Sequence, residues 1–565
     1  MNDKKLLKEA HPALPSLVEG LENKPQGRRQ FLRTATLLGL SASSAYLLAS
    51  KILGEDESII PVATAQEPET ARKQILRVAM TVPPIVDPAK YDFTEMANIT
   101  RHCCEYLAYS DPDGITLPQL AERWHASEDL KTWTFHLRRD AQWHNGDSFD
   151  VDDVLFNINR WLSPTLGSAN LGSFSPLTES VTYGGSTTKR KRSGAVERVD
   201  RFTFRLHLAQ PTLSIPENFT AYFAPIVHRG FSGNFAEQPN GTGPYQLAEY
   251  EVGKKAILTR SEKPYWGEQP MLDEIHYYDT GDSPVQMLEA LAKEQVDLVY
   301  SMDVRTLELA NALPDTSIYE IKSAATGVAR MNVNQVPFDN LDVRKAIQAC
   351  IDPSAFPAQA FNGRGAIAEH HHVGPMHPEY YELPRLTQDY DRARELLKLA
   401  GYGAGLNITI DCGNTNGLWQ QAICQIIKEQ LAPAGIDLTV NIVSKSEYWD
   451  IWKTTPFGIT TWTHRSLGTM VLNLAYRTGV PWNESGYSNP AFDAALDKAD
   501  SLIDIDERRE AMKDVQQILQ DDAIIIQPVW RPAFFVARDY VKGLVANASR
   551  LHHFENVTLI DQEIS

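Results

Sequence analysis

The chain has few cysteines for its length, five in 565 residues. Small disulfide-stapled folds are therefore excluded, because they need many cysteines within a short sequence. Cys103 and Cys104 lie in the apolar run "ITRHCCEYLAY" and are expected to be buried small side chains. Cys412 and Cys424 form a disulfide in an oxidising compartment only if their geometry permits it, which spacing does not decide.

Positive charge is also scarce, since 54 Lys and Arg residues face 72 Asp and Glu residues, a net charge of -18. Nucleic acid is excluded as a partner, because phosphate binding needs clustered basic residues. The acidic balance keeps a protein soluble but identifies no ligand. The length is too great for one small core, so two or three lobes are expected.

Motifs of catalysis are missing as well. The sequence has no G-x-S-x-G elbow, Walker A loop, H-E-x-x-H motif or pair of Cys-x-x-Cys motifs. The glycines of "GYGAGL" (401–406) follow a helical pattern and precede a strand pattern, the reverse of a dinucleotide site. No cofactor is expected, and only the general availability of His and Glu supports an enzyme as a hypothesis.

The N-terminal region has no long, strongly apolar run. It has only a moderately apolar stretch, which follows a pair of arginines. Arg28 and Arg29 precede a moderately apolar stretch, 34–50, that is too short and too rich in Ser, Thr and Gly to favour a membrane span. This pattern resembles the twin-arginine signal, which the Tat export machinery reads on folded proteins. A membrane anchor and an ordinary amphipathic helix are the alternatives.

A small-residue cleavage pattern, Ala63-x-Ala65, follows in "VATAQ". We therefore expect residues 1–65 to be a signal segment and Gln66 to be the new N-terminus. No cysteine lies near the cleavage point, so no lipid attachment is expected. The sequence predicts a free, acidic periplasmic protein.

Beyond Ile75 the patterns of strands and helices alternate. A helical period with acidic residues in its first turn covers "DVDDVLFNINRWL" (150–162), and a strand-then-helix pattern restarts beyond Ala329. Helices that alternate with short β-branched runs predict an α/β fold built of lobes.

A histidine cluster stands out in "AEHHHVGPMHPEYYELP". Neutral imidazoles bind nickel, copper or zinc, so the cluster supports a metal or metal-chelate receptor as the alternative function. Neighbouring side chains of an extended segment point in opposite directions, which favours cleft-lining or structural histidines instead. The four histidines are His370, His371, His372 and His377.

Several blocks occur in an order that is typical of one family. They are "LAERWHASEDLKTWTFHLRRDAQWHNGDSFDVDDVLFNINR" (120–160), "GTGPYQLAEYEVGKKAILTRSEKPYWG", "LEALAKEQVDL", "MNVNQVPFDNLDVRKAIQACID", "YDRARELLKLAGY" and "YSNPAFDAALDKA". Through these blocks nearly all of residues 75–550 resembles family 5 of the ABC-transporter extracellular solute-binding proteins, which bind peptides, nickel or opines.

The resemblance implies a periplasmic-binding-protein type II (cluster C) fold, in which two α/β lobes enclose a ligand cleft and one lobe carries an extra subdomain. It also implies a small-molecule solute and the membrane subunits of an ABC permease as partners, and it favours a monomer. Lobe I is expected at 75–115, 239–325 and 533–565, the extra subdomain at 116–238 and lobe II at 326–532.

One segment departs from the family pattern. Peptide binders of the family carry a Trp followed by a "DYPDP"-like run, whose Asp accepts the peptide's ammonium group. Here "TTWTHRSLGT" keeps Trp462 but continues with His464 and Arg465 and contains no acid. A guanidinium group favours carboxylate or phosphate, so the segment argues for a modified peptide, an opine-like conjugate or another solute with an anionic or hydrogen-bonding group.

Five more residues are candidates for the ligand site. Apolar packing with a few polar anchors is typical of such sites, although core packing is the alternative for each aromatic residue. The candidates are Trp482, Asn483, Trp419, Tyr91 and His372.

Overall fold

The computed structural model describes residue 7 and residues 11–23, 27–54, 73–183, 186–281 and 283–560. The predicted cleavage pattern at 63–65 lies outside these residues. Within them the fold is mixed α/β, as predicted, and no helix is both long and apolar enough to cross a membrane. The cysteines are buried free thiols, which confirms the expectation for Cys103 and Cys104.

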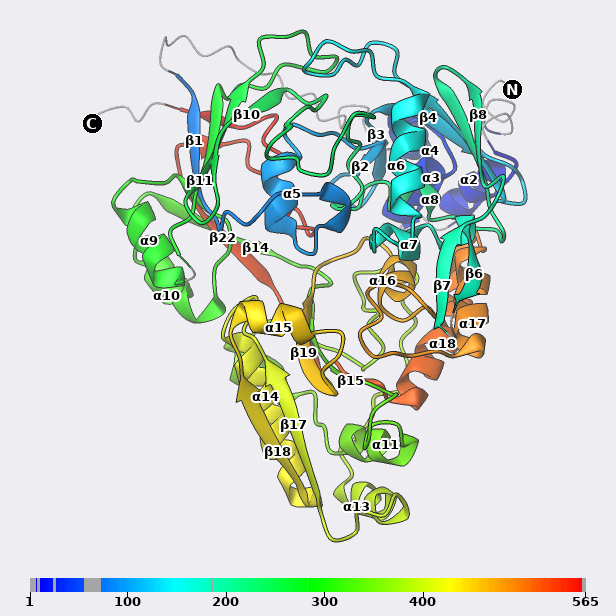
Figure 1. The fold of residues 1–565 in the computed structure, drawn as a ribbon, viewed down its shortest axis with the longest axis vertical. Helices are drawn as coiled ribbons and strands as arrows, with labels where there is room; N and C mark the ends of the chain where they lie inside the picture. The colour runs from blue at the N-terminus through cyan, green and yellow to red at the C-terminus, as the bar shows by residue number, and fades with distance from the viewer. Residues whose placement is uncertain are drawn as a thin grey trace.

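The upper part of Figure 1 contains a seven-stranded sheet. Its last strand in chain order, β22 near the C-terminus, is inserted among strands from much earlier in the sequence, because it pairs antiparallel with both β13 and β14. In spatial order the strands are β10 (Tyr245–Glu251), β11 (Lys255–Arg260), β12 (Glu274–Tyr278), β1 (Ile75–Ala79), β13 (Leu298–Val299), β22 (Ala533–Arg538) and β14 (Thr316–Ile321). The accompanying helices are α5 (Thr94–Thr100), α9 (Pro284–Ala292) and α10 (Leu307–Asn311).

A second seven-stranded sheet lies in the lower part of Figure 1. Every residue of its central strand β15 is buried, including the polar Thr326 and Arg330. The strands are β16 (Ala366–Ile367), β21 (Val529–Trp530), β15 (Thr326–Met331), β19 (Phe457–Trp462), β17 (Leu406–Cys412) and β18 (Ile436–Ile442), with β20 (Ile525–Ile526) beside β15. The helices are α11 (Leu341–Ala349), α12 (Ala355–Phe361), α13 (Tyr390–Leu399), α14 (Trp419–Leu431), α15 (Lys445–Ile451), α16 (Gly468–Ala475), α17 (Pro490–Asp500) and α18 (Ile505–Asp522).

The chain passes between the two large sheets at two short connections. Residues 322–325 join β14 to β15, and residues 531–532 join β21 to β22. The backbone N–H of Arg531 donates to the carbonyl of Ala325 at 2.9 Å, so the two connections are hydrogen-bonded to each other.

A smaller antiparallel sheet and several short elements occupy residues 108–218. The sheet has the order β4 (Ala121–Ala126), β5 (Thr132–Leu137), β9 (Thr203–His207) and β8 (Val196–Asp200). The other elements are β2 (Ala108–Ser110), β3 (Thr116–Pro118), α6 (Val151–Trp161), α7 (Asn170–Ser173), β6 (Thr178–Tyr183), β7 (Ser186–Lys191) and α8 (Ile215–Asn218). Near the C-terminus β23 (Val541–Lys542) pairs with β24 (Thr558–Leu559).

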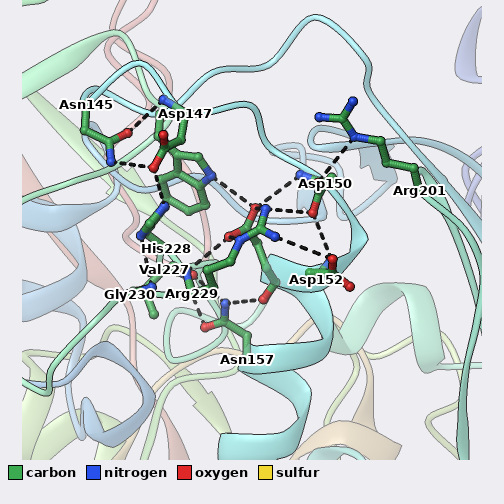
Figure 2. Close-up of polar contacts among 12 residues, drawn as sticks. Asn145, Asp147, Asp150, Asp152, Asn157, Arg201, Val227, His228, Arg229 and Gly230 are labelled. Carbon is green, nitrogen blue, oxygen red and sulfur yellow. Dashed lines mark hydrogen bonds and ion pairs between the residues drawn. The ribbon is translucent and has the colours of Figure 1, made fainter.

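The first residues of α6 anchor an ion-pair network (Figure 2). The Asp150 side chain caps the helix, and the fully buried Asp153 accepts from the Trp143 indole at 3.2 Å. Arg229 joins both acids, with Nε 2.9 Å from Asp153 Oδ1 and Nη2 2.7 Å from Asp150 Oδ1. The positive charge of Arg229 therefore compensates the buried negative charge of Asp153. The residues of the block 120–160 that form this network thus stabilise the fold.

Three helices precede the body of the protein: α2 (Leu14–Asn23), α3 (Arg28–Leu37) and α4 (Ala42–Leu53). In Figure 1 they lie beside β4 and α8. The indole of Trp124 donates to the carbonyl of Leu37 at 3.1 Å, and the Arg33 guanidinium donates to the carbonyl of Asp113 at 2.7 Å. Arg29 also donates to the Asp113 carbonyl, at 2.8 Å. The helix that carries the two arginines therefore docks on the folded body.

Candidate functional site

A cavity of ≈ 930 Å³ is lined by residues that follow strands of both large sheets and by the connection between them. The walls include Met80 and Met302 from the first sheet's side, Thr460 from β19 on the second, and Arg531 from the connection. A drug-sized or peptide-sized solute fits such a volume, which is within the usual range of ligand pockets. A molecule held there touches both halves of the protein.

Four of the predicted ligand residues line this cavity: Trp419, Trp462, Arg465 and Trp482. The rings of Trp462 and Trp482 meet edge to face, with centroids 5.9 Å apart. Two further indoles on the wall, Trp449 and Trp452, were not predicted and lie 5.7 Å apart. Indole faces give a binding site large apolar surfaces at a low cost in conformational entropy.

A buried acid positions Trp462. Glu484 accepts from the Trp462 indole N–H at 3.0 Å and from the Thr460 hydroxyl at 2.6 Å. Its third partner is the buried Arg330, whose Nε lies 3.3 Å from Glu484 Oε2. Burial raises the pKa of Glu484, and the Arg330 charge opposes that rise. The arrangement fixes the plane of the Trp462 ring against the cavity.

Trp419 begins α14 and lies against β15. Its indole N–H donates to the carbonyl of Asn416 at 2.8 Å. A Cβ atom at Gly327 on β15 would lie only 2.6 Å from the Trp419 ring, so glycine is needed for this close approach. The guanidinium of Arg531 also packs on this ring, 4.8 Å from its centroid. Trp419 is thus held between a strand and a cation.

Arg465 lies on the wall of the cavity and also on that of a second cavity of ≈ 530 Å³. Its Nη1 donates to the Thr463 hydroxyl at 2.7 Å and to the His464 carbonyl at 2.9 Å. The guanidinium lies 5.1 Å from the Tyr222 ring centroid, and its Nε has no hydrogen-bond partner among the described residues. Arg465 therefore keeps donor capacity for a ligand.

His464 lines the second cavity and not the first. Its Nδ1 accepts from the backbone N–H of Ala324, in the first connection between the sheets, at 3.1 Å. Burial lowers the pKa of His464 well below its ordinary value and that of the neighbouring His377 to about 3. Both imidazoles are neutral near pH 7. His464, which was expected to share one site with Trp462, thus lines a different cavity from that residue.

The other three predicted ligand residues lie behind the wall. Tyr91 is buried in the core, and the Asn483 side-chain amide donates to the carbonyls of Arg477 and Tyr487, which holds a turn. His372 shares a 2.7 Å hydrogen bond with the Tyr476 hydroxyl, and its ring lies 5.5 Å from that of Trp462. None of these three residues lines the cavity.

The histidine cluster does not converge within the described part of the chain. His370 Nδ1 accepts from the backbone N–H of Gln527 at 2.9 Å, and His371 Nε2 pairs with Glu369 at 3.1 Å. His370 and His372 both have positive φ, 60° and 58°, which turns the segment and separates their side chains. No group of three or more His, Cys, Asp or Glu residues arranged for a metal is found among the residues that the structure describes.

Sequence reasoning missed two arginines of the cavity wall, Arg531 and Arg550. No motif marks them: one lies in the connection between the sheets and the other in an irregular segment near the C-terminus. Glu95, Asp303 and Tyr300 also line the cavity and were not predicted. The only available signal was the position of Arg531 directly after a short apolar strand.

The fold matches solved periplasmic binding proteins of type II. A DppA from Helicobacter pylori, in complex with the peptide STSA, superposes with a TM-score of 0.75 at 22% identity and covers 86% of this chain and 98% of its own. The binding protein AgaA from A. tumefacien R10, in complex with agropinic acid, has a TM-score of 0.76 at 20% identity over 87% of this chain and 99% of its own. Both likenesses define the fold.

The family follows from the sequence match. Residues 116–495, about two thirds of the chain, match the family described as bacterial extracellular solute-binding proteins, family 5 Middle. The dipeptide-binding protein of Escherichia coli (strain K12) is 25% identical over 474 residues, which cover 78% of this chain and 86% of the relative. The chain belongs to family 5 of the bacterial extracellular solute-binding proteins.

Proteins of this family are the substrate-binding components of ABC importers, so the protein is a transport receptor and not an enzyme. The predicted periplasmic location agrees with relatives that are periplasmic binding proteins. The fold class and the family resemblance inferred from the sequence are thereby confirmed.

Proposed function

We propose that the ≈ 930 Å³ cavity captures a small organic solute, such as a peptide, a modified peptide or an opine-like compound, for delivery to an ABC permease. One observation carries the proposal: five tryptophans and the partly unpaired Arg465 line the same cavity. Indole faces bind the apolar part of a solute, and a guanidinium binds its anionic or hydrogen-bonding group. Relatives in complex with a peptide and with agropinic acid support this solute class.

The lobes of the proposed receptor are 75–115 with 239–325 and 533–565, and 326–532, with 116–238 as the extra subdomain of the first. The strands of the first large sheet come from the first set of ranges and those of the second sheet from 326–532, which supports this division. A solute that contacts both lobes better in a closed form shifts the population toward that form, which the permease then recognises.

The proposal predicts that a solute stabilises the purified protein. The test panel is the peptide STSA, agropinic acid and Met-Leu, the dipeptide bound by another similar structure. We expect at least one of them to raise the midpoint of thermal unfolding. A ligand at about a hundred times its dissociation constant adds roughly 2.7 kcal/mol to the free energy of unfolding. Differential scanning fluorimetry measures the shift, and isothermal titration gives the affinity. Nickel chloride serves as a comparison. A shift with nickel alone and with none of the organic solutes would contradict the proposal in favour of the metal receptor.

We also propose export by the twin-arginine pathway, with cleavage near Ala65 and no lipid anchor. The paired arginines at the start of α3 and the apolar helix α4 that follows support this route. Replacing both Arg28 and Arg29 with Lys is expected to keep nearly all of the protein in the cytoplasm, because the Tat receptor reads the guanidinium pair. Immunoblots of cell fractions measure the distribution, and Lys51→Arg is the control that leaves export unchanged. Undiminished export of the double variant would refute the proposal.

A further inference from the structure

Two arginines on the cavity wall, Arg531 and Arg550, form no ion pair with any acid in the part of the chain that the structure describes. Both side chains are about 6% exposed and line the ≈ 930 Å³ cavity. Nη1 and Nη2 of Arg550 and Nε of Arg531 have no hydrogen-bond partner among the described residues. A buried donor without a partner costs free energy, and for a charged group the cost is large. A ligand in the cavity that accepts hydrogen bonds from these N–H groups would remove this cost.

The fold positions Arg550 in a strained conformation. Its φ is 60°, in the left-handed region that a non-glycine residue occupies at a cost. The fully buried Asn98 holds this conformation, because its side-chain N–H donates to the Arg550 carbonyl at 3.1 Å and its Oδ1 accepts from the N–H of His552 at 2.9 Å. The guanidinium is set 4.4 Å from the centroid of the Tyr300 ring. Strain held in place by a buried side chain is typical of a binding site.

Arg531 is positioned from the other side. Its Nη2 donates to Asn416 Oδ1 at 2.6 Å, and its guanidinium packs on the Trp419 ring. Its backbone N–H bonds to Ala325, so it lies where both connections between the large sheets meet. The two guanidinium groups thus come from independent segments, and each is stacked on an aromatic ring that fixes its plane.

The local charges leave one positive charge in excess. Burial, together with the Arg550 charge, lowers the pKa of Arg531 to about 9, while Glu95 and Asp303 act in the opposite direction. Asp303 is already paired with Arg305, at 2.9 Å. Of the two acids that act on Arg531, Glu95 is therefore the one left to balance the two guanidinium groups, and a single monoanion beside them completes the balance.

We propose that Arg531 and Arg550 form a subsite that binds one carboxylate group of the transported solute. Planar guanidinium groups match the two oxygens of a carboxylate, and one negative charge matches the local excess, whereas a doubly charged phosphate exceeds it. The inference rests on the proposed function, in that the solute occupies this cavity. It defines the solute class further: an organic acid or a compound with a free carboxylate, anchored at the segment that joins the two large sheets.

Acetate, the minimal carboxylate, tests the subsite without knowledge of the natural solute. Thermal unfolding of the full chain is followed while acetate replaces chloride at constant ionic strength. Acetate is expected to raise the midpoint for the wild type, and Arg550→Gln should raise the apparent dissociation constant for acetate at least about tenfold, because charge-assisted hydrogen bonds are lost. Arg531→Gln carries the same expectation and serves if the first variant does not fold. Arg392→Gln, an exposed arginine paired with Glu395 on α13, removes the same charge and should respond to acetate as the wild type does.

Each outcome decides something. Equal midpoints in acetate and chloride, or an acetate response unchanged in Arg550→Gln and Arg531→Gln, would overturn the subsite. A phosphate response stronger than that of acetate and lost in the same variants would overturn the choice of carboxylate. If acetate fails but an organic solute of the panel still binds, the receptor function stands and the subsite falls. If acetate binds through Arg550 and no solute of the panel does, the subsite stands and the proposed solute class falls.

Discussion

Replacing Glu484 with Gln is expected to lower the free energy of unfolding by about 3 kcal/mol or more, because it leaves the Arg330 charge buried without a counter-charge. Arg330 is buried, and its remaining hydrogen-bond acceptors are the backbone carbonyls of Trp452 and Thr455. Urea unfolding followed by tryptophan fluorescence measures the change. The neighbouring indole of Trp462 keeps an acceptor in the glutamine oxygen, so the loss reports on charge and not on the tryptophan contact.

A double variant separates charge from packing in this experiment. Arg330→Met with Glu484→Leu removes both charges, and we expect it to recover most of the lost stability, since a buried ion pair contributes little against apolar residues of similar size. Glu429→Gln on the exposed side of α14 is the surface control and should change stability by less than about 0.5 kcal/mol. A Glu484→Gln protein as stable as the control would show that this pair does not carry a buried charge.

Replacing Arg465 with Ala is expected to weaken the binding of an anionic solute about a hundredfold, through the loss of charge-assisted hydrogen bonds inside a buried site. Thr463 and His464 accept from its Nη1, whereas its Nε has no partner among the described residues and is available to a solute. Isothermal titration with agropinic acid, or with STSA if that binds more tightly, measures the change.

Arg465→Lys is the matched variant, because it keeps the charge and loses the planar fork that stacks near the Tyr222 ring. We expect it to retain part of the affinity, between the wild type and Arg465→Ala. Affinities that are equal in all three proteins would remove Arg465 from the site.

Much of the fold could be predicted from the sequence, because ordered blocks such as 120–160 record local structure. The network around Asp153 and Arg229 shows why: helix caps and buried ion pairs demand particular residue types at fixed spacing. The same demand explains why that block did not identify the ligand site. A sequence block of this kind marks residues that are needed for local structure, and it carries no information on whether they lie near the cavity.

The site was only partly predictable, because sequence position does not tell on which side of a wall a residue lies. Trp462 faces the cavity while His372 packs behind it, although both are aromatic and both were candidates. Arg550 could not be predicted as a site residue for another reason. Its placement depends on a left-handed backbone and on Asn98, a residue more than 400 positions away in the chain.

The place of β22 in the first large sheet has a consequence for biosynthesis. β1 is synthesised more than 400 residues before β22, the strand that lies between β13 and β14. At roughly 5–20 residues per second, the early strands wait for tens of seconds before their sheet can close. The first large sheet therefore cannot close until β22 has been synthesised.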